Sequence, residues 1–316
     1  MKHLVIPIFI VLSCNLFGQS TKGNSNNIDT TQFVNIGGIK QFISVKGNKS
    51  NPLMLYLHGG PGAATSSHRQ KITNILEDHF LVVHWDQRGA GKSLNSDLKL
   101  PTLSVMKQDA EELFLYLLKA FNKDKIELVA NSWGTVLGFH LAQKYPSNIA
   151  SLVAISPLIN NQKSQNLTNK KLISHYKEQK NMEAVNQLKS IHIPYETVED
   201  MATQFRWISD FKGTHIPEDE FKHYMAFFKE WEQQWMPLYK ELYVINLLKH
   251  KTVFKIPTYV LIGDQDLTTS SELTEAFFKK LVAPKKQLLW LEDVGHQIPM
   301  YKSQEMQTFV CNMLVK

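Results

Sequence analysis

The stretch that decides the fold is Ile126-Glu127-Leu128-Val129-Ala130-Asn131-Ser132-Trp133-Gly134. Its first five residues form a short, mostly apolar run that is typical of a central strand, and residues 134–145 continue with a helical pattern. A serine at such a strand-to-helix turn matches the nucleophile-elbow pattern G-x-S-x-G, with Ala130 in place of the first glycine. The sequence therefore predicts that Ser132 stands at the exposed tip of a tight turn.

The expected turn also explains which residues surround Ser132. An elbow of this kind is sharp and strained, so its neighbours must be small, and Ala130 and Gly134 meet that need. The helix that begins there would point its N-terminus at the Ser132 hydroxyl. The backbone N–H of Trp133 would then donate to an oxyanion that develops on a substrate.

Around this turn, strand-like and helix-like segments alternate along the chain. Short apolar runs of the strand type lie at residues 39–45, 53–57, 80–85, 126–130, 150–155, 257–262 and 287–291. Patterns of the helix type lie at residues 103–121, 134–145, 271–282 and 303–314. This alternation predicts an α/β fold with a mostly parallel central sheet flanked by helices.

One long segment, residues 158–250, interrupts the alternation. It contains no strong strand pattern and is rich in aromatic residues at helical spacing, including Trp207, Trp231 and Trp235. We interpret it as a helical cap inserted into a core made of residues 32–157 and 251–316. A cap between two strands usually covers a pocket, so we expect most of its aromatic residues in its own core and a minority facing an apolar pocket.

The composition is that of a folded protein. The 316 residues are 43% hydrophobic and 20% charged, which excludes general disorder. With 15 Gly, 12 Pro and 2 Cys, the chain is not collagen-like and not a disulfide scaffold. The formal charge of +6 comes from scattered basic residues, so it indicates solubility rather than an anionic partner.

The N-terminus has the pattern of an export leader. A weakly basic head, an apolar run too short to span a membrane and a small, polar tail predict a signal peptide over residues 1–18. An alternative is a lipoprotein signal with Cys14 as the lipidated residue. Residues 19–31 are polar and aperiodic and predict a linker. We therefore expect a periplasmic or secreted protein, in which Cys311 is a core residue of the last helix.

A second glycine-rich segment, His58-Gly59-Gly60-Pro61-Gly62, follows the strand that ends at residue 57. Glycines at this position let backbone N–H groups face a cavity. Gly60 is therefore the predicted second donor of the oxyanion hole. We expect His58 to anchor the loop, because a better candidate for the catalytic base comes later in the chain.

That base is His296, which follows the strand over residues 287–291. Asp266 lies just beyond the strand over residues 257–262, and the order Ser132, Asp266, His296 is the order of the triad in α/β hydrolases. Asp264 and Asp293 are the alternative acids. The serine would attack, the histidine would transfer its proton, and the carboxylate would orient the imidazole.

Two of these motifs together resemble a known family. HGGPG at residues 58–62 and WDQRGAGKS at residues 85–93 resemble the prolyl iminopeptidase branch of the α/β hydrolases, and the resemblance covers roughly residues 33–157 and 250–314. It implies an α/β-hydrolase fold with a helical cap and a cofactor-free Ser-Asp-His hydrolase. The residues implied are Ser132, Asp266 and His296, with the Gly60 and Trp133 amides as the oxyanion hole.

The chain departs from the family pattern in two places. Ala130-Asn131 stands where the family commonly has two glycines, and the cap cannot be matched residue by residue. In the family, cap glutamates bind the free amine of the substrate. Glu230 and Glu232 are the candidates for that role here.

The leading hypothesis is a serine aminopeptidase that releases an N-terminal proline or another small residue from short peptides. The same triad would serve a carboxylesterase, lactonase or amidase, and a non-catalytic binding protein on this scaffold is a third possibility. The sequence contains no motif for nucleic acid or nucleotide binding, and no residue spacing that indicates a metal site.

Overall fold

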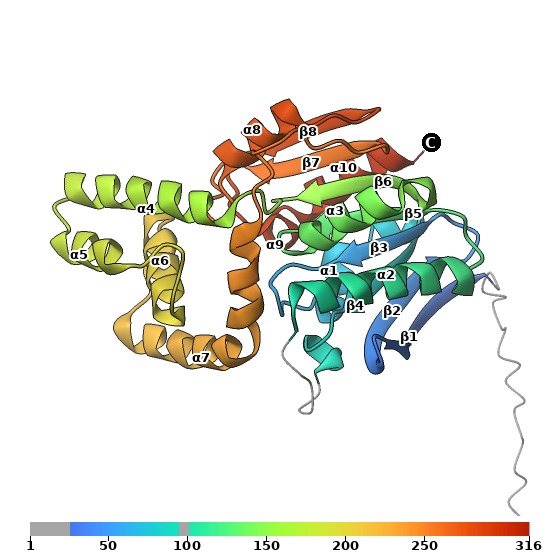
Figure 1. The fold of residues 1–316 in the computed structure, drawn as a ribbon, viewed down its shortest axis with the longest axis horizontal. Helices are drawn as coiled ribbons and strands as arrows, with labels where there is room; N and C mark the ends of the chain where they lie inside the picture. Colours follow the sequence, from blue (N-terminus) through green and yellow to red (C-terminus); the bar gives the residue numbers. More distant parts are fainter. Residues whose placement is uncertain (1–25, 95–100, 316) are drawn as a thin grey trace, which may run out of the picture.

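The computed structural model of the chain describes residues 26–94 and 101–315. Its strands are β1 Asn27–Ile36, β2 Ile39–Asn48, β3 Leu53–Leu57, β4 Leu81–Asp86, β5 Ile126–Asn131, β6 Ile149–Ile155, β7 Thr258–Gly263 and β8 Lys286–Leu291. They form one eight-stranded sheet in the order β1-β2-β4-β3-β5-β6-β7-β8 (Figure 1). The strands from β3 to β8 are parallel, and β1 and β2 add an antiparallel edge.

Helices cover both faces of the sheet, because the central strands are apolar on both sides. Successive side chains of β3 point to opposite faces, so Leu55 and Leu57 join one core and Met54 and Tyr56 join the other. The first core is closed by α2 Leu103–Ala120, α3 Gly134–Lys144 and α8 Ser271–Lys280. The second is closed by α1 Arg69–Ile72, α9 Ile298–Tyr301 and α10 Ser303–Leu314.

The core elements lie close to where the sequence predicts them. The helices expected over residues 103–121 and 134–145 correspond to α2 and α3, each one residue shorter. Helix α10 has the predicted bounds, and Cys311 within it is half-buried against the second core. Strong apolar periodicity, with Thr102 accepting a hydrogen bond from the first turn of α2, accounts for this agreement.

Strand β1 corrects the predicted N-terminal linker. The linker expected over residues 19–31 is wrong in its last part, because β1 begins at Asn27 and pairs with β2 along its whole length. The two strands are joined by Gly37 and Gly38, whose positive φ angles of 58° and 75° suit a two-residue hairpin turn. In residues 27–31, where the linker was expected, the side chains are exposed or half-buried at the sheet edge, so this part of the strand shows no apolar alternation. The leader predicted over residues 1–18 lies outside the described residues.

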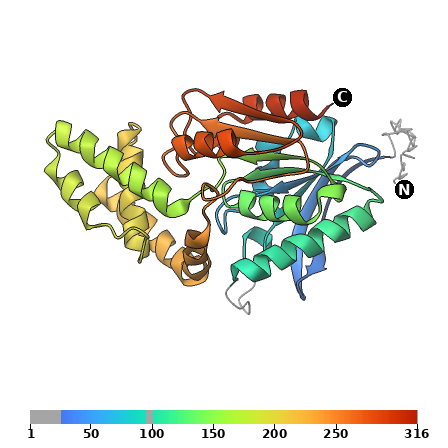
Figure 2. The same ribbon diagram turned by 45° about the horizontal axis from the view of Figure 1, so that its top comes forward.

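A helical cap lies between β6 and β7 in the chain. It consists of α4 Asn161–Glu178, α5 Met182–Ser190, α6 Val198–Phe211 and α7 Glu218–Glu241. Figures 1 and 2 show it as a separate body beside the sheet, and α7 bends back to the core. Pro237 lies inside α7, where it removes one hydrogen bond of the helix and favours a bend. Within the parts of the chain that the structure describes, no helix is both long and apolar enough to cross a membrane.

The aromatic residues of the cap divide between packing and pocket. Trp207 belongs to a small core of the cap itself, and its indole N–H donates to Gln187. Trp235 is buried against the main core. Trp231 lines a cavity between the cap and the sheet, where its indole N–H donates to the Pro61 carbonyl at 3.0 Å.

Candidate active site

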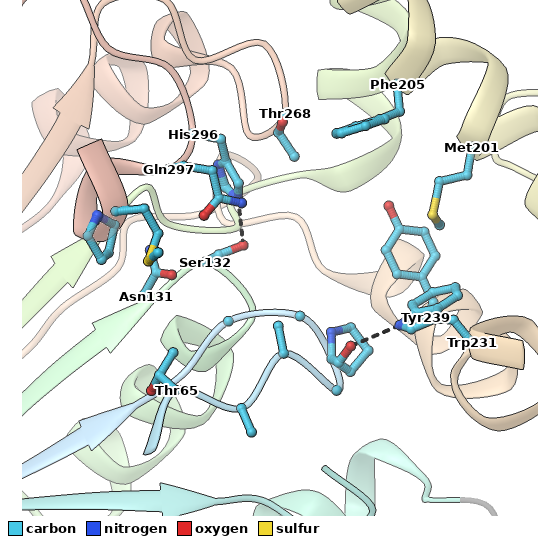
Figure 3. A pocket seen from close by; sticks show the side chains of 18 of the residues that line it. Thr65, Asn131, Ser132, Met201, Phe205, Trp231, Tyr239, Thr268, His296 and Gln297 are labelled. Carbon is cyan, nitrogen blue, oxygen red and sulfur yellow. Dashed lines mark hydrogen bonds between the residues drawn. The ribbon is translucent and has the colours of Figure 1, made fainter. Parts of the chain in front are cut away.

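Three side chains from separate loops meet beyond the carboxyl ends of the parallel strands. Ser132 follows β5, Asp266 follows β7 and His296 follows β8. His296 Nε2 lies 2.9 Å from Ser132 Oγ (Figure 3). On the other side of the ring, His296 Nδ1 lies 3.0 Å from Asp266 Oδ2. A neutral imidazole in this position donates at Nδ1 and accepts at Nε2, so it can take the proton of the hydroxyl.

Asp266 is the candidate acid that reaches the His296 ring. Asp264 instead accepts a weak hydrogen bond from the Val294 N–H at 3.3 Å. Asp293 is exposed in a left-handed turn with φ of 55°. Of the three carboxylates weighed from the sequence, Asp266 therefore has the geometry that the role requires.

The environment of Asp266 keeps its carboxylate charged. Burial alone would raise the pKa of Asp266, but the nearby His296 and the hydrogen bonds from His296, Thr269 and Thr268 outweigh burial and hold this pKa well below its usual range. The backbone N–H groups of Thr268 and Thr269 donate to Oδ1 at 2.9 and 3.0 Å. The Thr269 hydroxyl donates to Oδ2 at 3.0 Å, which fixes the carboxylate plane.

The backbone around Ser132 has the predicted strained turn. Ser132 has a positive φ of 51°, an unusual conformation for a residue with a side chain, and its N–H donates to the Ile155 carbonyl at 2.8 Å. A methyl group at Gly134 would lie 2.3 Å from the Leu57 carbonyl oxygen. The turn therefore depends on glycine at position 134.

Ala130 takes the place of the first glycine of the elbow motif, and the packing around it explains why alanine fits there. A methyl group added at Gly138, one turn into α3, would lie 3.0 Å from the Ala130 methyl. The glycine at position 138 thus leaves the room that Ala130 occupies. Asn131 lines the cavity beside Ser132, and its side-chain amide donates weakly to the Ile155 carbonyl.

The two predicted oxyanion donors lie in the loops next to Ser132. Gly60 lines the same cavity as Ser132, and Trp133 directly precedes the first residue of α3. A methyl group at Gly59 would lie 3.3 Å from Ser132 Cβ, so the glycine loop passes directly beside the serine. The donor role of the Gly60 and Trp133 amides stays a prediction.

Gln87 connects these two loops. Its side-chain amide donates to the His58 carbonyl at 3.1 Å and accepts from the Trp133 indole N–H at 2.8 Å. Its backbone N–H donates to His58 Nε2 at 3.1 Å, while His58 Nδ1 donates to the Gly59 carbonyl at 2.7 Å. Burial lowers the pKa of His58 to about 4, so this histidine is neutral and anchors the loop.

Glycines in the motifs at residues 58–62 and 85–93 also let the cap helix α7 lie close to the core. A methyl group at Gly62 would lie 2.6 Å from the indole nitrogen of Trp235 on α7. One at Gly89 would lie 2.4 Å from the side-chain amide of Gln234, which donates to the Gly89 carbonyl. Both motifs therefore seat α7 against the core next to the active site.

A cavity of about 470 Å³ opens between Ser132 and the cap. Figure 3 shows Ser132 and His296 facing cap side chains across this space, with Asn131 and Thr65 on the core side. The cap contributes Gln165, Tyr195, Gln204, Phe205, Trp231 and Tyr239, among others. None of the described residues that line the cavity is an aspartate or a glutamate.

The two predicted amine-binding glutamates do not line this cavity. Glu230 is exposed on α7. Glu232 accepts the Val198 N–H at 3.1 Å, so it caps the first turn of α6. Neither residue is among those that line the cavity above Ser132, so the structure does not support a substrate-binding role for Glu230 and Glu232, and that role stays a prediction.

The polar residues of the cap that do line the cavity were not predicted. Gln165 and Gln204 lie on amphipathic helices, and Tyr195 lies in the connection before α6. An uncharged polar residue on an amphipathic helix is usually solvated, so the sequence carries no signal that sets these residues apart. Among the described residues, no group of three His, Cys, Asp or Glu side chains is arranged to hold a metal ion.

The chain is similar in sequence and in fold to known proteins. A sequence profile of the alpha/beta hydrolase fold matches residues 52–181, a range that includes the glycine loop and Ser132. The chain has the α/β-hydrolase fold. The mostly parallel sheet, the candidate site at the carboxyl ends of its strands and the cap inserted between β6 and β7 agree with this fold.

The chain is similar to proteins of the prolyl iminopeptidase-like branch of the α/β hydrolases. It is 26% identical over 290 residues to the probable aminopeptidase YbaC of Bacillus subtilis (strain 168), spanning 83% of this chain and 89% of that protein. It is 37% identical over 113 residues to a proline iminopeptidase of Clostridium botulinum, spanning 35% and 36% of the two chains. A proline iminopeptidase-related protein from Thermus thermophilus has the same fold, with a TM-score of 0.61 at 20% identity over 91% of this chain and 99% of that one.

Proposed function

We propose that this α/β hydrolase is a serine hydrolase that cleaves an ester or amide bond through an acyl-enzyme on Ser132. The observation that carries the proposal is the hydrogen-bonded chain from Ser132 Oγ through His296 to Asp266, at 2.9 and 3.0 Å. Ser132 and His296 line a cavity that is large enough for a small substrate.

In the first half of the reaction, Ser132 Oγ attacks the substrate carbonyl while His296 Nε2 takes the serine proton. The negative charge that develops on the carbonyl oxygen is stabilised by the backbone N–H groups of Gly60 and Trp133. His296 then protonates the leaving amine or alcohol, which departs. Asp266 stabilises the imidazolium during these steps and holds Nδ1 as a donor.

In the second half, a water molecule replaces the leaving group. His296 takes a proton from the water while the water oxygen attacks the acyl carbonyl, and a tetrahedral intermediate forms. Its collapse breaks the bond to Ser132 Oγ, which receives the proton back from His296. The product is a carboxylic acid, and the enzyme returns to its starting state.

Two substrate classes follow from different observations. Similarity to the B. subtilis protein named as a probable aminopeptidase supports release of an N-terminal proline or small residue. The absence of a carboxylate from the described cavity wall favours an uncharged ester or amide, because a free amine would enter without a counter-charge. An esterase, lactonase or amidase is therefore the second candidate.

The experiment is a comparison of purified wild type with Ser132→Ala. We expect hydrolysis of 4-nitrophenyl esters or arylamides by the wild type and none above background by the variant. Turnover of proline or alanine arylamides would select the aminopeptidase, and turnover of esters alone would select the second candidate. Equal rates for wild type and Ser132→Ala would contradict the proposal.

We also propose that the chain is exported, because residues 1–18 have the pattern of a signal peptide. Expression of the full chain in a secreting host should release a protein shortened by the leader. Intact mass separates the two versions of the leader, because a lipoprotein would begin at Cys14 and carry lipid. A full-length protein that stays in the cytoplasm would contradict export.

A further inference from the structure

A row of aromatic side chains runs along one face of α7, from the cavity above Ser132 to the outer surface of the cap. Tyr224, Phe227, Phe228 and Trp231 have the spacing of residues that share one face of a helix. Trp231, at the inner end, is half-buried and lines the catalytic cavity. At the outer end, 37% of Tyr224 and 62% of Phe227 are exposed. The row therefore passes from the cavity wall to the solvent.

Phe205 of helix α6 joins this row. Its ring centre lies 6.1 Å from that of Phe228, and the ring centres of Phe228 and Phe227 are 5.9 Å apart, with both pairs in edge-to-face contact. Figure 3 shows Phe205 on the side of the cap that faces Ser132 and His296. Because 43% of Phe205 is exposed, these three rings form an aromatic cluster that is open to solvent.

The three phenylalanines of the aromatic cluster border two cavities. They line the catalytic cavity, and together with Glu220, His223 and Tyr224 they line a second cavity of about 590 Å³ on the cap. Because the same three rings belong to both walls, an apolar surface connects the site of bond cleavage with the outside of the cap.

The position of the aromatic cluster indicates what covers it. Contiguous exposed apolar side chains mark a binding site more often than isolated ones do. The first turn of α7 is acidic and includes Glu220 at the edge of the second cavity, which disfavours contact with an anionic lipid surface. Continuity with the catalytic cavity favours instead a part of the substrate that extends away from Ser132.

We propose that the aromatic cluster of Phe205, Phe227 and Phe228 is a subsite for an apolar chain of the substrate. The substrate class is an ester or amide whose acyl or leaving group carries an alkyl or aryl chain long enough to reach from Ser132 to these rings. Phe205 and Phe227 are then residues that set specificity. This inference rests on the proposed function, because it concerns the substrate that Ser132 attacks.

Two series of esters measure the preference of the wild type. One varies the acyl chain of 4-nitrophenyl esters from acetate to octanoate, and the other keeps an acetyl group and varies the alcohol from ethyl to octyl. Each CH₂ that is fully buried raises kcat/KM by about fourfold, so a chain that is partly covered should gain about tenfold or more across one of the series. A wild type whose kcat/KM rises in neither series would overturn the inference.

Phe227→Ser tests the aromatic cluster itself, because Phe227 is largely exposed and is not part of the cap core. The gain from the shortest to the longest ester should fall by about fivefold, while the shortest ester is turned over as by the wild type. Phe227→Leu should restore most of the gain, because it restores apolar area.

Phe33→Ser is the matched control, since 56% of Phe33 is exposed on β1 and this residue lines neither cavity. It should leave the preference for long chains unchanged. An unchanged preference in Phe227→Ser, or an equal loss in Phe33→Ser, would overturn the assignment of the aromatic cluster.

Two other occupants of the aromatic cluster are outcomes of the same experiment. Rates are measured below the concentration at which the esters form micelles, and a gain that appears only above it would assign the cluster to a lipid surface. A dimer that Phe227→Ser dissociates, detected by sedimentation velocity, would assign the cluster to a second copy of the chain. Either result would overturn the inference.

Ethyl and octyl fluorophosphonates separate this inference from the proposed function. Both react with an activated serine, and only the octyl chain is long enough to reach the aromatic cluster. We expect the octyl probe to label the wild type faster, and the difference to shrink in Phe227→Ser. Equal labelling by the two probes would overturn the subsite alone, whereas a wild type that neither probe labels would overturn the serine hydrolase itself.

Discussion

Replacing Asp266 by asparagine tests the orientation of His296 most sharply. Asparagine has nearly the shape of aspartate, and its oxygen can keep the two hydrogen bonds from the Thr268 and Thr269 amides at the Oδ1 position. The position of Oδ2 is then taken by an NH₂ group. That group faces His296 Nδ1 at 3.0 Å and the Thr269 hydroxyl at 3.0 Å.

The size of the effect follows from this geometry. An NH₂ group cannot accept from His296 Nδ1–H, so the imidazole is driven to the tautomer with its proton on Nε2. That tautomer donates to Ser132 Oγ and cannot take the serine proton. We therefore expect kcat/KM to fall by about a thousandfold to ten-thousandfold, or roughly 4–5 kcal/mol of transition-state stabilisation.

The assay is steady-state hydrolysis of the best ester or arylamide substrate, with Asp264→Asn as the matched control. Asp264 precedes Asp266 by two residues but bonds only to the Val294 N–H, so its replacement should change kcat/KM by less than about threefold. Circular dichroism shows whether both variants are folded. A folded Asp266→Asn within tenfold of the wild type, or an equal loss in Asp264→Asn, would refute the reasoning.

Further predictions concern the supports of the site. Gly134→Ala should lower the free energy of unfolding by about 1–3 kcal/mol, because the added methyl meets the Leu57 carbonyl; urea denaturation measures this loss, and unchanged stability would contradict it. His58 is neutral when folded and has a pKa of about 4 against an ordinary 6.5, so the stability that it contributes is lost as pH falls from 6.5 to 4. This loss amounts to about 3 kcal/mol, and His58→Asn should show a shallower acid dependence in urea unfolding. Gln87→Leu leaves the His58 carbonyl and the Trp133 indole unpaired. It should lower stability by about 2–4 kcal/mol and kcat more than KM; a KM effect alone would exclude a positioning role.

The candidate triad could be predicted from the sequence because each member lies directly after a strand. Parallel strands bring their carboxyl ends to one edge of the sheet, so chain order and loop position were enough to bring Ser132, Asp266 and His296 together. The choice of Asp266 over Asp264 rested on position, because the acid of such a triad normally lies a few residues beyond its strand, on the loop that reaches the histidine. The structure supplies the atomic reason, which is that Asp266 Oδ2 reaches His296 Nδ1.

The cap could not be predicted at the same level. A helix exposes several charged residues, and nothing in the sequence says which of them turns toward a cavity. Glu232 was proposed for the substrate and instead caps α6, while Gln165 was not singled out and lines the cavity. The first strand was missed for a related reason, because β1 at the sheet edge is held by backbone pairing and buries few side chains.

The most direct test of the Ser132 nucleophile is covalent labelling of the native protein with a fluorophosphonate, followed by peptide mass spectrometry. We predict one adduct on the peptide that contains Ser132, with labelling abolished in Ser132→Ala and strongly slowed in His296→Ala. A native, folded protein that carries no adduct at Ser132, or that labels equally after Ser132→Ala, would contradict a serine hydrolase mechanism.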